Sequence, residues 1–144
     1  FASIGININE VYGMSECTGA TTWSTDACHL WTSIGYEFPG AEVKIFEMKE
    51  NGTKSECPAA KDFYNPLEES QGEVCFRGRH IMMGYLCNPK LGEEHVEEMK
   101  KKNAETIDKD GWLHSGDKGS KDVNNMYRIT GRYKELIITA GGEN

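Results

Sequence analysis

Hydrophobic and polar residues alternate in several stretches of the chain, and this alternation predicts strands. The clearest stretch is residues 42–48, which we expect to form a strand with one buried face. Residues 72–78 are a second strand with a glycine at each end, and residues 112–114 and 126–130 are shorter ones. Because Gly-, Asn- and Asp-containing turns separate short strands, we expect a small β-barrel or curled sheet over residues 35–132.

Residues 93–106 have the one convincing helical pattern. Glutamates lie near the start and lysines follow later, which is the charge order that the helix dipole favours. The apolar face is thin, so we expect the helix on the surface. Residues 1–11 predict a strand that leads into a polar loop, and residues 18–25, rich in Thr, Gly and Ser, predict a loop. The predicted fold class is α+β and β-rich.

Composition narrows the class of protein. The 144 residues are 38% apolar and 27% charged, which is globular composition. The net charge of −7 argues against a nucleic-acid partner. The five cysteines lack the spacing of zinc ligands, so we expect no zinc site. Because their number is odd and no C-x-x-C pair is present, we expect free thiols and a reducing, cytoplasmic compartment. Because the first residue is Phe1 and neither end has a polar tail, we expect an internal piece of a longer protein.

One short segment near the start concentrates chemically useful groups: Tyr12-Gly13-Met14-Ser15-Glu16. The tyrosine ring can stack on adenine, and the serine hydroxyl can donate to a phosphate. The glutamate offers the hard oxygen ligands that Mg²⁺ prefers. The alternative is a turn at a strand end with a core tyrosine.

A carboxylate and a guanidinium near the other end suggest a nucleotide site. Asp117 lies at a Gly-flanked turn and can accept two hydrogen bonds from a ribose diol, and Arg132, at a strand end, can donate to phosphate. A calcium loop that begins at Thr106 is a rival interpretation. It lacks an acid at its first position and a glutamate at its last. His114 could be a base, although a lone histidine on a strand is more often a hydrogen-bonded neighbour.

Four segments, in this order, resemble the adenylate-forming superfamily of acyl-CoA synthetases, firefly luciferases and peptide-synthetase adenylation domains. They are residues 12–16, 72–78, 110–117 and 131–144, so the resemblance covers nearly the whole chain. Residues 12–16 and 129–144 are similar to the bubblegum-type long-chain fatty acyl-CoA synthetases in particular.

The resemblance implies a ligase that activates a fatty acid with Mg-ATP to acyl-adenylate and then transfers it to coenzyme A. It implies these roles: Tyr12 stacks on adenine, Gly13 and Met14 line the acyl-adenylate, Ser15 touches the α-phosphate, Glu16 holds Mg²⁺, Asp117 accepts the ribose hydroxyls, Arg132 contacts the ribose-phosphate, Lys134 is the hinge, and Gly141 and Gly142 approach the coenzyme A channel.

The resemblance also divides the chain. Residues 1–34 would end an α/β subdomain, residues 35–132 would form the β-barrel, and residues 133–144 would be the hinge and the start of a small C-terminal domain. Where this chain has Ser15, most relatives have Thr, so the side-chain hydroxyl is kept. Where it has Gly131, most relatives have Asp, so that carboxylate is lost. The phosphate loop and the C-terminal lysine lie outside the chain, so the piece alone should be inactive.

Other functions stay open at this point. The chain could come from a catalytically inactive AMP-binding relative, from a ligase for short- or medium-chain or aryl acids, or from an unrelated β-rich interaction module. The retained Glu16, Asp117 and Arg132 favour the enzyme. Its partners would be a fatty acid, ATP and coenzyme A. Peripheral association with the endoplasmic reticulum or another membrane is kept as an alternative to a purely cytoplasmic location.

Overall fold

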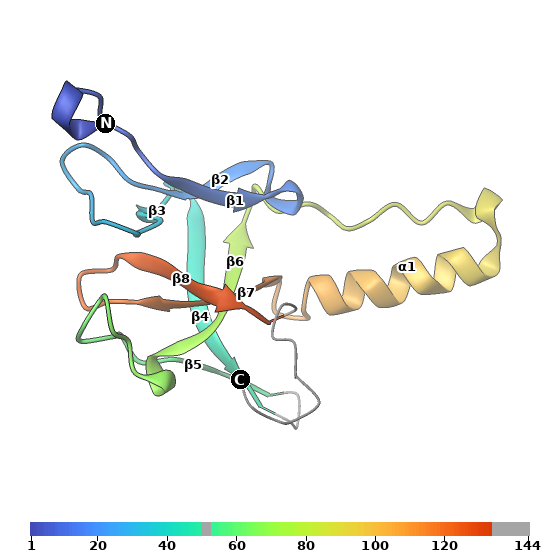
Figure 1. Ribbon diagram of the computed structural model, residues 1–144. Helices are drawn as coiled ribbons and strands as arrows, with labels where there is room; N and C mark the ends of the chain where they lie inside the picture. The colour runs from blue at the N-terminus through green and yellow to red at the C-terminus, as the bar shows by residue number, and fades with distance from the viewer. Residues whose placement is uncertain (50–52, 134–144) are drawn as a thin grey trace, which may run out of the picture.

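A computed structural model of the protein describes residues 1–49 and 53–133, which form two antiparallel sheets (Figure 1). The smaller sheet has the order β1-β2-β3, with β1 at Val11–Met14, β2 at Gly19–Trp23 and β3 at Tyr36–Glu37. The larger sheet has the order β5-β4-β6-β7-β8, and its strands are β4 (Ala41–Met48), β5 (Lys54–Glu56), β6 (Gln71–Gly78), β7 (Leu113–Lys121) and β8 (Tyr127–Arg132). The remaining elements are the helix α1 (Glu93–Thr106) and the short 3₁₀ turns η1 (Ala2–Ile4), η2 (Ser15–Cys17), η3 (Glu68–Ser70) and η4 (Pro89–Leu91). The predicted α+β, β-rich class is confirmed.

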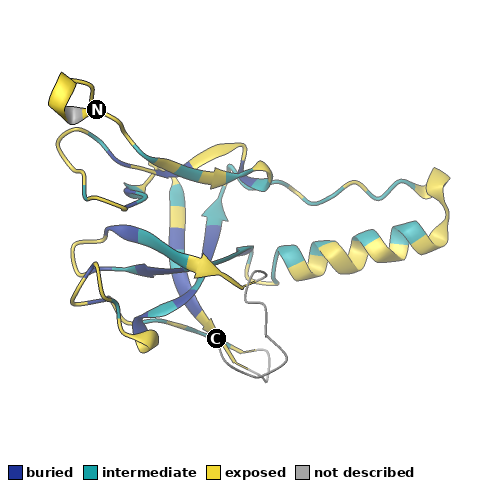
Figure 2. Cartoon of the chain, viewed as in Figure 1, coloured by how far each residue is buried: buried dark blue, intermediate teal, exposed yellow. Residues whose placement is uncertain are grey.

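The core lies along the strands of the larger sheet, and Figure 2 shows their buried segments in dark blue. The alternation predicted for residues 42–48 places Val43 and Ile45 of β4 inside, and their neighbours on β6 and β7 are Val74, Phe76 and Leu113. Tyr12 of β1 packs on this core, with its ring centroid 5.7 Å from that of Phe76. Burial of these side chains therefore joins the smaller sheet to the larger one.

Tyr127 of β8 fixes the two sheets to each other. Its backbone N–H donates to the carbonyl of Gly35, 3.1 Å away, and its carbonyl accepts from the backbone of Ile34 at 2.9 Å. Its buried hydroxyl donates to the carbonyl of Val43 at 2.9 Å. Since these bonds satisfy polar groups that are cut off from water, they hold β8, which ends at Arg132, in a defined place.

The helix α1 has the predicted bounds and lies on the surface, because none of its residues is buried. Figure 1 shows it projecting to one side of the sheets. Asn103 of α1 accepts from the backbone N–H of Tyr85 at 2.5 Å and donates to the Tyr85 carbonyl at 2.9 Å. This pair of bonds attaches the helix to the segment between β6 and η4. Among the described residues, no helix is long and apolar enough to cross a membrane.

Three predictions about strands were wrong. The first strand begins only at Val11, so Tyr12, Gly13 and Met14 lie within it rather than in a loop after it. The predicted loop over residues 18–25 contains β2, because hydrogen bonds to both β1 and β3 outweigh its Thr- and Gly-rich composition. Asp117 lies inside β7 rather than in a turn. The proposed subdomain boundaries stay a prediction.

Candidate nucleotide site

Tyr12, Asp117 and Arg132 meet at one place on the molecule. The Tyr12 hydroxyl donates to Oδ2 of Asp117, across 105 residues of sequence. The Arg132 Nε donates to Oδ1 of the same carboxylate at 3.0 Å, since β7 and β8 pair these two residues directly. The structure therefore brings together the two ends of the chain that the sequence assigned to one ligand.

The electrostatics of this group favour a neutral phenol beside an ion pair. Burial raises the pKa of Tyr12, and the hydrogen bond and negative charge of Asp117 raise it further, so the hydroxyl stays a donor. The Asp117 side chain is 16% exposed, whereas that of Arg132 is 55% exposed. The guanidinium thus faces solvent, where an anionic group can reach it.

A bulge in β7 determines the position of Asp117. His114 pairs with Cys75 and Lys118 with Glu73, so residues 115–117 of β7 lie opposite the single residue Val74. Gly116 has a φ of +76°, which favours glycine. Its backbone N–H donates to Oε1 of Glu73 at 2.9 Å, in place of a strand-to-strand bond.

The segment after Tyr12 is shaped by two close contacts. A Cβ at Gly13 would lie 1.9 Å from the carbonyl oxygen of Gly19, so the approach of β1 to β2 requires glycine there. The buried thiol of Cys17 bonds to the backbone N–H and carbonyl of Met14, each at 3.2 Å, and this holds the η2 turn. Met14 packs against the core, and Ser15 is exposed.

Glu16, in the η2 turn, is the candidate metal ligand. Its Oε1 accepts from the hydroxyl of Tyr85 at 2.6 Å, and its backbone carbonyl accepts from Met82 at 2.8 Å. The half-buried carboxylate keeps a second oxygen, Oε2, whose hard, anionic character suits Mg²⁺. The donor type therefore fits a magnesium ion.

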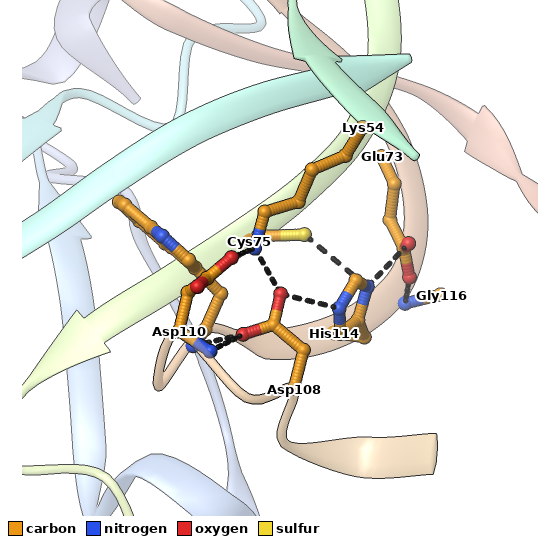
Figure 3. A network of polar contacts seen from close by, with 8 residues as sticks. Lys54, Glu73, Cys75, Asp108, Asp110, His114 and Gly116 are labelled. Atoms are coloured by element: carbon orange, nitrogen blue, oxygen red, sulfur yellow. Dashed lines mark hydrogen bonds and ion pairs between the residues drawn. The ribbon is translucent and has the colours of Figure 1, made fainter. Parts of the chain in front are cut away.

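A second polar cluster lies beside the bulge (Figure 3). Glu73, Cys75 and His114 place their donor atoms within 4.8 Å of one another. The His114 Nδ1 contacts the Glu73 carboxylate at 2.8 Å and its Nε2 lies 3.4 Å from Asp108. The hydrogen bond to Glu73 raises the pKa of His114 against the opposing effect of burial. Because these contacts satisfy both ring nitrogens, we interpret the cluster as a hydrogen-bonded network that holds β6 against β7.

The rival calcium loop does not match these contacts. Asp108 Oδ1 accepts from the backbone of Asp110 at 2.9 Å and of Trp112 at 3.0 Å, and Oδ2 pairs with Lys54. Asp117 bonds elsewhere, to Tyr12. The acids of the supposed loop therefore serve two separate networks.

Some candidate residues lie outside this group. Lys134, Gly141 and Gly142 fall outside the described residues, so their roles stay predictions. Sequence reasoning did not find Glu73, which contacts Gly116 in the bulge, or Tyr85, which contacts Glu16. No local sequence pattern indicates that these residues, which lie far apart along the chain, are in contact.

Two hollows of about 530 and 350 Å³ lie elsewhere on the described part of the chain, and neither is lined by Tyr12, Asp117 or Arg132. Glu73 and Gly116, which bond to each other at the bulge, are among the residues that line the larger one.

Curated relatives match the chain over its whole length. It is 43% identical to a chicken (Gallus gallus) protein and 36% to a human one, both named long-chain-fatty-acid–CoA ligase ACSBG2. It is 42% identical to the long-chain-fatty-acid–CoA ligase heimdall of Drosophila melanogaster. In each case 100% of this chain is covered, but the chain spans only 15–17% of the relative.

Solved structures with the same fold are adenylate-forming enzymes. ATP-bound MatB from Rhodopseudomonas palustris superposes with a TM-score of 0.71 at 25% identity, over 95% of this chain and 23% of that one. O-succinylbenzoate coenzyme A synthetase from Bacillus subtilis, in complex with ATP and magnesium, gives 0.68 at 22% identity over 97% and 24%, which shows the fold alone. The family described as AMP-binding enzyme matches residues 1–86. The resemblance found in the sequence is confirmed, and the chain belongs to the AMP-binding enzyme family.

Proposed function

We propose that this chain is part of an AMP-forming long-chain fatty acid–CoA ligase. The observation that carries the proposal is the meeting of Tyr12, Asp117 and Arg132 across 105 residues of sequence. An aromatic ring, a carboxylate and a guanidinium at one place are the groups that recognise adenine, a ribose diol and phosphate. The names of the relatives at 36–43% identity supply the fatty acid and coenzyme A.

Each candidate residue has a role in this proposal. Tyr12 stacks on adenine, Asp117 accepts the ribose hydroxyls and Arg132 donates to the ribose-phosphate. Gly13 and Met14 line the acyl-adenylate, and Ser15, which is exposed at the start of the η2 turn, donates to the α-phosphate. Lys134 acts as the hinge, and Gly141 and Gly142 form the loop at the coenzyme A channel.

The reaction proceeds in two halves. The fatty carboxylate attacks the α-phosphate of ATP and pyrophosphate leaves, and the thiol of coenzyme A then displaces AMP. Glu16 would hold Mg²⁺, which supplies positive charge to the departing phosphates. ATP use is also supported by the ATP-bound MatB structure at 25% identity.

The 55% exposure of the Arg132 side chain fits a chain that spans 15–17% of its relatives, because the remaining walls of the site would come from other parts of the protein. We propose a cytoplasmic location, which the five free cysteines support. Peripheral attachment to the endoplasmic reticulum or another membrane is the alternative.

A pyrophosphate-release assay on the complete protein tests this function. The protein is given ATP, Mg²⁺ and acids of increasing length, with an aryl acid alongside. We expect release that rises with chain length and acyl-CoA formation once coenzyme A is added. Release with short or aryl acids alone would indicate another ligase, and AMP binding without any release would indicate an inactive relative.

A further inference from the structure

The carboxylate of Glu73 on β6 bonds to β7 at two points on either side of Ser115. Its Oε1 accepts from the backbone N–H of Gly116 at 2.9 Å, and its Oε2 contacts His114 Nδ1 at 2.8 Å. Figure 3 shows both contacts converging on the one carboxylate. The side chain is 13% exposed, so these bonds are shielded from solvent.

This carboxylate replaces the bonds that the bulge removes. With residues 115–117 opposite the single residue Val74, the regular ladder between β6 and β7 is interrupted over a stretch that ends with Asp117. A half-buried N–H without an acceptor would be costly, so Glu73 stabilises this bulged conformation over a regular strand. Three residues opposite one are two more than a regular ladder holds, so with His114 still opposite Cys75 a regular strand would carry Asp117 two positions along β6, to the level of Gly72.

We propose that Glu73 is a positioning residue for the nucleotide: it fixes the bulge that aims the Asp117 carboxylate at Tyr12 and the ribose. This rests on the proposed function, in which Asp117 receives the ribose hydroxyls. Glu73 itself touches the backbone next to Asp117 and not the ligand. Its loss therefore weakens AMP and ATP binding and leaves the fatty acid site unchanged.

The test measures AMP binding by calorimetry in the complete protein, together with the KM values for ATP and for the fatty acid. Glu73→Ala removes both contacts, and we expect AMP binding to weaken about tenfold, equivalent to about 1.4 kcal/mol. Glu73→Gln keeps an oxygen that can accept from Gly116 and should restore most of the affinity. Glu42→Ala is the matched control, because Glu42 is also a strand glutamate paired with a cation, Arg77, on the same sheet.

A double variant separates positioning from general stability. If Glu73 acts through Asp117, Glu73→Ala adds nothing to the weakening already caused by Asp117→Ala. Equal weakening in both backgrounds, or a KM for the fatty acid that rises as much as that for ATP, would overturn the proposal. Because AMP binding is measured directly, a wild-type protein that binds AMP but releases no pyrophosphate would refute the ligase function while still testing Glu73.

Discussion

Asp117→Ala is the most direct perturbation of the candidate site. The substitution removes the carboxylate that accepts from the Tyr12 hydroxyl on one oxygen and from Arg132 Nε, 3.0 Å away, on the other. If the same carboxylate also accepts the two ribose hydroxyls, two hydrogen bonds to a charged group are lost, each contributing about 1.5–3 kcal/mol. The lower end of that range gives a loss of about 3 kcal/mol, or roughly hundredfold weaker AMP binding.

Calorimetric titration of the complete protein with AMP measures this loss. Asp117→Asn keeps the shape and one acceptor oxygen, so its affinity should fall between those of the wild type and the alanine variant. Asp110→Ala is a control for nearby charge, because Asp110 pairs with Lys54 at 3.0 Å and its side chain is 50% exposed. A thermal melt of each variant shows whether it is folded at the temperature of the titration.

The result that would refute the reasoning is unchanged AMP affinity in a folded Asp117→Ala variant. That outcome would mean that the contact between Tyr12 and Asp117 is structural only. An equal loss in Asp110→Ala would also count against it, since the effect would then come from overall charge rather than from the ribose contacts.

Three further predictions follow from the chain. Lys134→Pro should leave pyrophosphate release intact and slow thioester formation, because proline freezes the φ rotation that a hinge needs, and equal slowing of both steps would contradict it. The hydrogen bond to Glu73 raises the pKa of His114, so the bond stabilises the fold fully below about pH 6.5, and this stabilisation is lost as the pH rises through the raised pKa. His114→Gln should therefore flatten this part of the profile of melting temperature against pH, and an unchanged profile would argue against the pair. Gly13→Ala should lower the melting temperature and weaken AMP binding, since its Cβ would meet the carbonyl of Gly19 at 1.9 Å; a wild-type melt would mean that β1 can move aside.

Helices and strands were predicted correctly where the local sequence pattern agreed with the burial of the residues in the fold. The helix α1 was found with its bounds because glutamates precede lysines along it, and β4 and β6 because their alternate residues enter the core. β2 was missed because its strand structure comes from partners on both sides. β7 was predicted too short because Gly116 and Gly119 resemble turn residues. Gly119 is in fact demanded by packing, since a Cβ there would lie 2.6 Å from Val74.

The candidate site was predicted only in part. The meeting of Tyr12, Asp117 and Arg132 was expected from the resemblance and matches the contacts in the structure. Glu73 could not be found, because a glutamate in an alternating strand has the pattern of a solvent-facing residue. The role of Glu73 depends on the extra residues of β7. A bulge in β7 does not change the residue types of the opposite strand, β6, so the sequence of β6 does not reveal it.

The long separation between Tyr12 and Asp117 has a consequence during synthesis of the protein. Their hydrogen bond spans 105 residues, and ribosomes elongate at roughly 5–20 residues per second, so about 5–20 s pass between the two residues. During that interval β4 and β6 are made but still lack β7 and β8, so apolar side chains such as Phe76 are without their full set of contacts. A ribosome-bound chain that ends before β7 is therefore expected to be a target for chaperones, and the contacts among Tyr12, Asp117 and Arg132 can form only after β8 has left the exit tunnel.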